Sequence, residues 1–78
     1  MLISTGLYLQ RSFEKSLPDG TTRQVNDVVH LKEKIAPTKF RATVVGARSR
    51  HSEVIDICTL EGAVELKKHE FEELVKSL

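Results

Sequence analysis

Cysteine is almost missing from this chain: Cys58 is the single cysteine among 78 residues, so no disulfide can form within the chain. A lone thiol fits a reducing compartment, and we expect a cytoplasmic protein. Long apolar runs are missing too, because no stretch approaches the roughly 18 residues that a membrane-spanning helix requires. Residues 1–10 lack the basic start and continuous apolar stretch of a signal peptide. We therefore expect no membrane partner.

Aromatic residues and glycine are scarce as well. The chain has no tryptophan, one tyrosine and three phenylalanines, and its four glycines are spread singly. No glycine-rich phosphate loop, G-x-S-x-G elbow or paired-carboxylate pattern is present. His30, His51, His69 and Cys58 have neither C-x-x-C nor H-x-x-x-H spacing. We therefore expect no enzyme activity, no metal and no cofactor.

The composition that remains is that of a small globular protein. A hydrophobic share of 40% and a charged share of 29% are ordinary for a folded chain. Seventy-eight residues are enough for one domain with a small core, and we expect that domain to span residues 1–78.

The first half of the chain predicts a long hairpin. An alternation of period two indicates a strand at about residues 2–15, with Gly6 marking a bend. Residues 17–20 (LPDG) predict a tight turn, since proline presets φ and Asp-Gly tolerates the left-handed region. Residues 21–31 then return as the second strand.

The second half predicts three shorter strands. Residues 32–39 are expected to be a charged connection, because Pro37 cannot donate to a central ladder. Residues 40–45 (FRATVV) are the strongest strand pattern, with alternate side chains facing a core. The remaining elements expected are a basic loop at residues 46–52, a strand at 54–58, a turn at 61–62 and a strand at 63–66.

The C-terminal end changes period. Phe71, Leu74, Val75 and Leu78 fall at i, i+3, i+4 and i+7, which predicts a helix at about residues 68–77. We expect this helix to cap one end of the sheet, and Cys58 to be buried. The expected core consists of Phe40, Ala42, Val44, Ile55, Ile57, Val64, Leu66, Phe71 and Leu74.

About five short strands and one helix predict a mainly β fold with a C-terminal helix, either a small SH3-like barrel or an OB-like barrel. Residues 26–31 (NDVVHL), followed by a strand like residues 40–45, resemble the first barrel strands of KOW- or Tudor-type SH3-like modules. The resemblance covers about residues 25–66 and implies a small β-barrel binding module. Asn26 stands where those modules usually carry a glycine.

Basic residues are concentrated in the middle of the chain. Residues 32–51 contain six basic and one acidic residue, whereas residues 52–78 contain three basic and seven acidic residues. A basic stripe with serines at an arginine-rich hairpin tip can neutralise phosphates, although a solvated tip has the same pattern. We predict a module that binds DNA or RNA. The residues expected to contact phosphates are Lys39, Arg41, Arg48 and Arg50, with His51 and Tyr8 as edge or stacking contacts.

A second interpretation is a protein-binding regulator or inhibitor of a larger complex. Short chains without enzyme motifs are typical of accessory proteins of bacteria and their phages or other mobile elements, which is an argument by association. The acidic helix or an open edge of the hairpin would then be the interface, and a homodimer is compatible with either interpretation.

Overall fold

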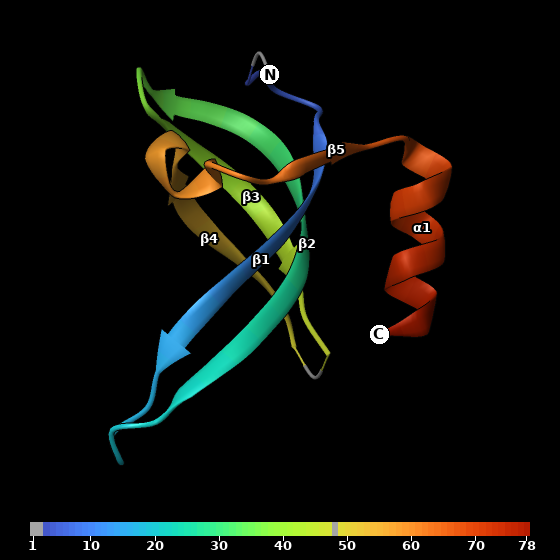
Figure 1. Cartoon of the computed structure of the whole chain (residues 1–78). Helices are drawn as coiled ribbons and strands as arrows, with labels where there is room; N and C mark the ends of the chain where they lie inside the picture. The colour runs from blue at the N-terminus through green and yellow to red at the C-terminus, as the bar shows by residue number, and fades with distance from the viewer. Residues whose placement is uncertain (1–2, 48) are drawn as a thin grey trace.

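The computed structural model describes residues 3–47 and 49–78. Five strands form one antiparallel sheet, in the order β4-β3-β2-β1-β5 (Figure 1). The strands are β1 (Tyr8–Ser16), β2 (Thr22–Ala36), β3 (Lys39–Val45), β4 (Arg50–Asp56) and β5 (Val64–Leu66). A 3-10 helix, η1 (Ile57–Leu60), precedes β5, and the α-helix α1 (Lys68–Ser77) follows it. The prediction of a mainly β fold with a C-terminal helix is confirmed.

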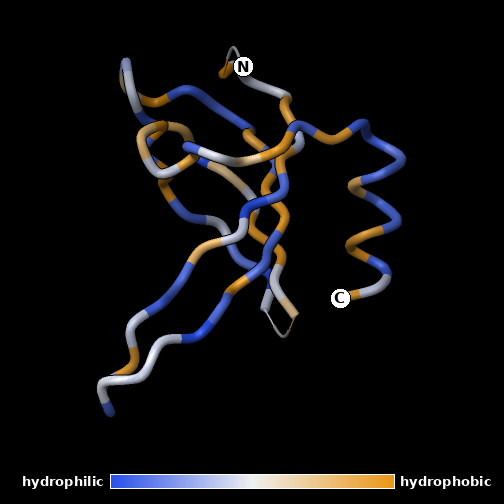
Figure 2. The backbone as a smooth tube through the Cα atoms, viewed as in Figure 1, coloured by the Kyte–Doolittle hydropathy of each residue, from blue (hydrophilic) through white to orange (hydrophobic). Residues whose placement is uncertain are grey.

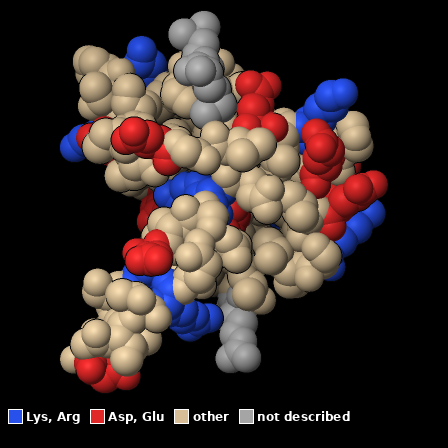
Figure 3. Space-filling view, in the orientation of Figure 1, with Lys and Arg blue, Asp and Glu red and all other residues tan. Residues whose placement is uncertain are grey.

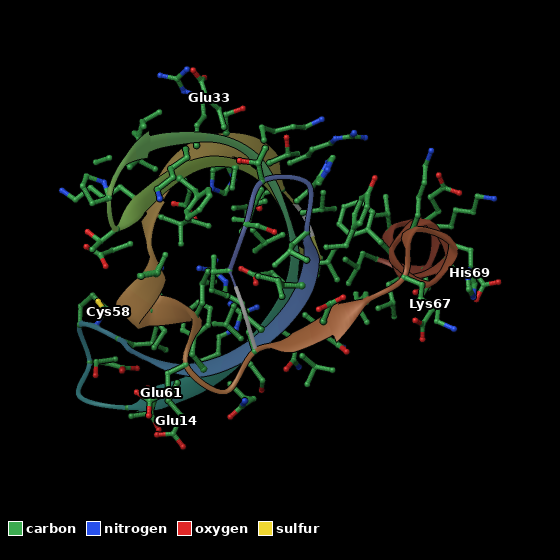
Figure 4. The ribbon with its side chains drawn as sticks, turned by 90° about the horizontal axis from the view of Figure 1, so that it is seen from above. Glu14, Glu33, Cys58, Glu61, Lys67 and His69 are labelled. Carbon is green, nitrogen blue, oxygen red and sulfur yellow. The ribbon has the colours of Figure 1, made fainter. Side chains whose placement is uncertain are left out.

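The sheet is strongly curved and encloses its own core. Seen from above, the strands bend around a common centre into which side chains point, and α1 lies outside this ring (Figure 4). Two irregularities in the β2–β3 register bend β2 where it joins the core, as β-bulges do. Leu60 of η1 packs into the same cluster. The buried cluster consists of Leu9, Val29, Leu31, Phe40, Ala42, Val44, Ile55 and Leu60.

One half of the first hairpin extends beyond the rest of the sheet. Residues 11–16 of β1 and 22–27 of β2 pair with each other, and the described residues place no third strand beside them (Figure 1). We call residues 11–27 the arm. At its tip the Gly20 N–H donates to the Leu17 carbonyl at 3.0 Å, and Gly20 has a φ of 87°. The predicted turn at residues 17–20 is therefore confirmed.

Several element boundaries differ from those expected. The strand expected at residues 2–15 begins only at Tyr8, because the chain bends at Gly6, whose φ is 93°. The expected connection at residues 32–39 is wrong: β2 continues to Ala36, and only Pro37 and Thr38 turn the chain into β3. Pro37 is tolerated because it lies in the turn and needs no ladder hydrogen bond.

The expected loop at residues 46–52 is also too long. β4 already begins at Arg50 and pairs with β3 from there to Asp56. The strand expected at residues 54–58 also ends two residues early, at Asp56. There the Asp56 carboxylate accepts a hydrogen bond from the Cys58 N–H at 3.1 Å, and η1 begins. An N-cap of this kind ends an extended strand because it satisfies a backbone donor outside the ladder.

The helix α1 has the predicted bounds but not the predicted burial. It lies against the outer face of the sheet, where Phe71 contacts Tyr8 with ring centroids 4.7 Å apart. None of its residues is fully buried, so the expected core positions Phe71 and Leu74 are wrong. The inner face is already filled by strand side chains, and the helix has only the outer face to cover. No helix within the described ranges is long and apolar enough to cross a bilayer.

The expected core is wrong at two further positions. Val64 is 59% exposed and Leu66 is only partly buried, because β5 is a short edge strand. Ile57 is partly buried and packs against the core cluster. In place of the wrong positions the core uses Leu9, Val29, Leu31 and Leu60. Figure 2 shows hydrophobic positions recurring where the strands cross, while the arm is mainly hydrophilic.

Cys58 is exposed, and its expected burial is wrong. It lies in η1 at the rim of the ring and not in a strand (Figure 4). A hydrogen bond with the Asp56 carboxylate is the main cause that raises the pKa of the Cys58 thiol, with smaller contributions from desolvation and the Asp56 charge. A raised pKa leaves less thiolate at neutral pH, and the thiolate is the nucleophile.

We therefore expect an aromatic disulfide reagent to label Cys58 in the native protein without unfolding it. The Asp56→Asn variant keeps an N-cap acceptor but removes the charge, so its native labelling at neutral pH should be severalfold faster. Stopped-flow absorbance measures the labelling rate of each protein in buffer and in denaturant. If Cys58 reacted in the native protein only at the rate of global unfolding, its exposed position would be contradicted.

Candidate nucleic-acid interface

The predicted nucleic-acid contacts divide between the two faces of the sheet. Lys39 and Arg41 lie on the outer face of β3, and Arg50 lies on the outer face of β4, where it pairs in register with Val45. His51 follows Arg50 in the same strand and therefore points to the inner face, opposite Val44. Arg48 lies outside the described residues. The structure thus places Lys39, Arg41 and Arg50 on one face, with Lys39 and Arg50 at opposite ends of the β3–β4 pair, and it places His51 on the other face.

The outer cations of β3 are loosely held. Arg41 Nη1 lies 2.9 Å from Glu33 Oε2, and both side chains are more than half exposed. Lys39 is exposed and lies opposite Asp56 in the β3–β4 register. Exposed ion pairs contribute about 0–1 kcal/mol, so a phosphate can replace the carboxylate partner at little cost.

A groove between α1 and the outer face of the sheet collects further basic residues. Its volume is about 400 Å³, and we call it the α1 groove. Its lining residues are Tyr8, His30, Lys32, Arg50, Phe71, Glu72, Val75 and Lys76. Lys32 comes from β2, Arg50 from β4 and Lys76 from α1. The lining of the α1 groove therefore contains three cations from three elements and one carboxylate, that of Glu72.

Stacked rings border the α1 groove. Tyr8 and His30 are cross-strand partners whose ring centroids are 4.1 Å apart with an interplanar angle of 11°. Phe71 is tilted against both rings, at 4.7 Å from Tyr8 and 6.0 Å from His30. Burial lowers the pKa of His30, and the charges of Lys32 and Lys68 lower it further. His30 is therefore neutral at pH 7 and acts here as an aromatic packing residue.

The inner face carries a separate ion-pair network. Arg11 of β1 binds Asp27 of β2 through two hydrogen bonds, Nε–Oδ1 at 2.8 Å and Nη2–Oδ2 at 2.7 Å. The same Nη2 lies 3.5 Å from Glu53 of β4, whose other carboxylate oxygen lies 3.7 Å from His51 Nε2. The Asp27 hydrogen bond is the main cause that raises the pKa of Arg11. Since β1 and β4 do not pair, this network joins the two sides of the curved sheet.

The α1 groove was missed in the sequence, although parts of its signal are visible there. The period-two pattern places Tyr8 and His30 on strands, and the helical period places Phe71 and Val75 on one stripe of a helix. These residues line one groove only because α1 packs on the outer face of the sheet, and local sequence patterns do not show which face a helix covers. On the face drawn in Figure 3, acidic and basic side chains are interspersed, with no extended patch of one sign.

Other chemistry has little support in the described ranges. Within residues 3–47 and 49–78, no group of three or more His, Cys, Asp or Glu side chains is placed to hold a metal ion. Comparison of the chain with protein-family models, curated proteins and solved structures gives no match. The geometry of the outer face is therefore the basis for assigning a function.

Proposed function

We propose that this chain is a non-catalytic nucleic-acid-binding module that contacts phosphates with the outer face of its sheet. The observation that carries the proposal is the α1 groove, where Lys32, Arg50 and Lys76 surround the stacked Tyr8 and His30 rings. Basic side chains supply the non-specific affinity for a phosphate backbone, and their convergence from three elements gives that affinity a defined location. The curved five-stranded sheet supports the resemblance to SH3-like modules, which is part of the proposal.

Lys39 and Arg41 extend this basic surface along β3. Arg48 precedes Arg50 by two residues in the chain, and its role stays a prediction. Glu33 and Asp56 lie beside Arg41 and Lys39, so these two cations give a weaker contribution than the α1 groove. The largest loss of binding is therefore expected from the groove residues and not from β3.

The triple variant Lys32→Gln, Arg50→Gln, Lys76→Gln tests this proposal. Each phosphate contact adds roughly −0.9 to the slope of log K against log salt on duplex DNA, and about −0.7 on single strands. Removing three contacts should therefore flatten the slope by about two to three. Fluorescence anisotropy with a labelled generic oligonucleotide, at roughly 50 to 200 mM salt, measures the slope.

A charge-matched control is available on other surfaces. Lys34, Lys67 and Lys68 are three exposed cations that neither line the α1 groove nor lie on the arm. Their change to glutamine removes the same net charge and should alter the slope by less than half as much. Equal slopes for the two triple variants, or no binding by the wild type at low salt, would contradict the proposal.

A protein-binding role is the second candidate, and a specific observation favours it. The inner side of the arm exposes Phe13, which is 41% accessible, beside Val25 and Leu17 in one groove. Its strands also have unpaired edges, which can accept an added strand. Affinity capture from lysate with and without nuclease separates the two roles, because nuclease removes only partners held through nucleic acid.

A further inference from the structure

All side-chain amides of this chain lie on one face of one hairpin. Gln10, Gln24 and Asn26 are the only glutamine and asparagine residues among the 78. All three are exposed and have the strand parity of Tyr8 and His30, which places them on the outer face. Small hydroxyl residues lie beside them in the same hairpin. Ser12 is opposite Asn26 and Ser16 is opposite Thr22, while Gln10 is opposite Val28 and Gln24 is opposite Glu14.

This amide face is accessible and partly pre-organised. Gln24 Nε2 donates to Ser12 Oγ across the two strands, which orients one amide over the ribbon. Two paired strands lie about 4.8 Å apart, and a two-stranded ribbon of this kind fits the B-DNA major groove, about 12 Å wide. In the described residues no third strand pairs with the arm, no arm residue lines the α1 groove, and the outer-face residues of the arm are exposed.

The chemistry of the amide face matches base edges better than phosphates. Asparagine and glutamine pair in a bidentate manner with adenine N6 and N7, and serine and threonine bond to either kind of edge. Glu14, the one carboxylate on this face, can accept from cytosine N4. The arm as a whole is electrically neutral, since Arg11, Lys15 and Arg23 balance Glu14, Asp19 and Asp27. It therefore offers little affinity for a generic phosphate backbone.

We infer that the nucleic acid is B-form duplex DNA and that the arm enters its major groove and reads bases through Gln24 and Asn26, while Gln10, paired with β2 and β5 just before the arm, adds a contact at its base. This inference rests on the proposed function, because the α1 groove supplies the affinity and the arm supplies the base contacts. A-form RNA has a deep and narrow major groove that side chains cannot read. Single strands need free aromatic faces, whereas Tyr8 here stacks on His30 and Phe71 packs against both.

The two surfaces are placed so that one duplex can contact both. Gln10 and Arg50 are the exposed ends of a row across four strands of the outer face, and the two valines between them, Val28 and Val45, are buried. Three interstrand spacings separate Gln10 from Arg50, roughly 14 Å along the sheet. That separation is close to the width of a major groove, so a cation at Arg50 can meet the phosphates beside a groove that the arm occupies.

The experiment is a selection from a pool of random duplexes, with the wild type and the Gln10→Ala, Gln24→Ala, Asn26→Ala variant run in parallel. The wild type should enrich a short motif, with a preference of roughly 5- to 150-fold for each base that an amide reads in a bidentate manner. The triple amide variant should bind selected and unselected duplexes equally, with the salt slope of the wild type. The single variant Asn26→Ala should relax the preference at one position only.

The groove variant Lys32→Gln, Arg50→Gln, Lys76→Gln is the matched control, since it should weaken binding to every duplex and keep the motif. If the wild type binds DNA in a salt-dependent way but enriches no motif, or the amide variant enriches the same motif, base reading by the arm is overturned and the proposed function stands. A preference for duplex RNA or single strands overturns the assignment to B-form DNA. Absence of binding to every nucleic acid overturns the inference and the proposed function together.

Discussion

Replacing Phe40 with alanine is expected to remove about 3–5 kcal/mol from the free energy of unfolding. Phe40 is 3% exposed and lies in the buried cluster, with Ile55 of β4 as its register partner. Its loss leaves a cavity that a sheet curved on itself cannot close without breaking β-ladder hydrogen bonds. Domains have about 5–15 kcal/mol of stability in total, so the variant should be close to unfolding at room temperature. Urea titration followed by far-ultraviolet circular dichroism measures the change.

The other two phenylalanines are matched controls for the same chemical change. Phe71 of α1 is half-buried against Tyr8, and Phe13 is 41% exposed with the Arg11 guanidinium 5.3 Å from its ring centre. Phe13→Ala should cost at most about 1 kcal/mol, the size of an exposed cation–π contact. The expected order of destabilisation is Phe40, then Phe71, then Phe13. A Phe40→Ala loss no larger than that of Phe13→Ala would contradict the position of the core.

Local patterns were sufficient to predict most elements of this fold. The alternation in residues 40–45 depends only on which residues face inward, and Phe40, Ala42 and Val44 are buried as expected. The helical period at the C-terminus likewise predicted α1 with the observed bounds. Both signals are carried by neighbouring residues and need no knowledge of the tertiary arrangement.

The errors came from tertiary choices that local patterns do not record. The charged residues at 32–34 led to the prediction of a connection. In the structure β2 continues to Ala36, and this end of the strand is largely exposed, so it tolerates charged side chains. The apolar stripe of α1 reads as a core element, but a sheet that closes on itself fills its inner face without it. Cys58 follows a run that contains Val54, Ile55 and Ile57, but the Asp56 cap ends the strand and places Cys58 in η1.

The site was predicted in part for the same reason. Arg41 and Arg50 lie on the outer face, and the basic character of this region was visible in the charge distribution. Residues 48–51 were expected at a hairpin tip, where side chains need not alternate between the two faces of a sheet. Because β4 begins at Arg50, strict alternation sends His51 to the inner face. The contribution of Lys76 required knowing which face α1 covers.

Removing the Arg11 guanidinium is expected to destabilise the fold by about 3–5 kcal/mol, because it leaves the Asp27 carboxylate buried without its partner. The Asp27 side chain is 7% exposed, and within the described ranges its hydrogen bonds come from Arg11 alone. Arg11→Met keeps most of the apolar stem of the side chain, so the loss reports the charge and not the packing. Denaturant unfolding of the variant measures it.

The reverse change should cost less. In Asp27→Asn the Arg11 guanidinium keeps Glu53, at 3.5 Å, as a counter-charge, and Glu53 is exposed enough to remain hydrated. The double variant Arg11→Met, Asp27→Leu replaces the pair by apolar side chains of similar size, and such replacements are often neutral or stabilising. It should therefore recover most of the stability lost in Arg11→Met. The single variant Asp27→Leu completes the comparison. If the double variant loses as much stability as Arg11→Met and Asp27→Leu added together, Arg11 and Asp27 act independently, and the ion pair does not hold β1 and β2 together at the base of the arm.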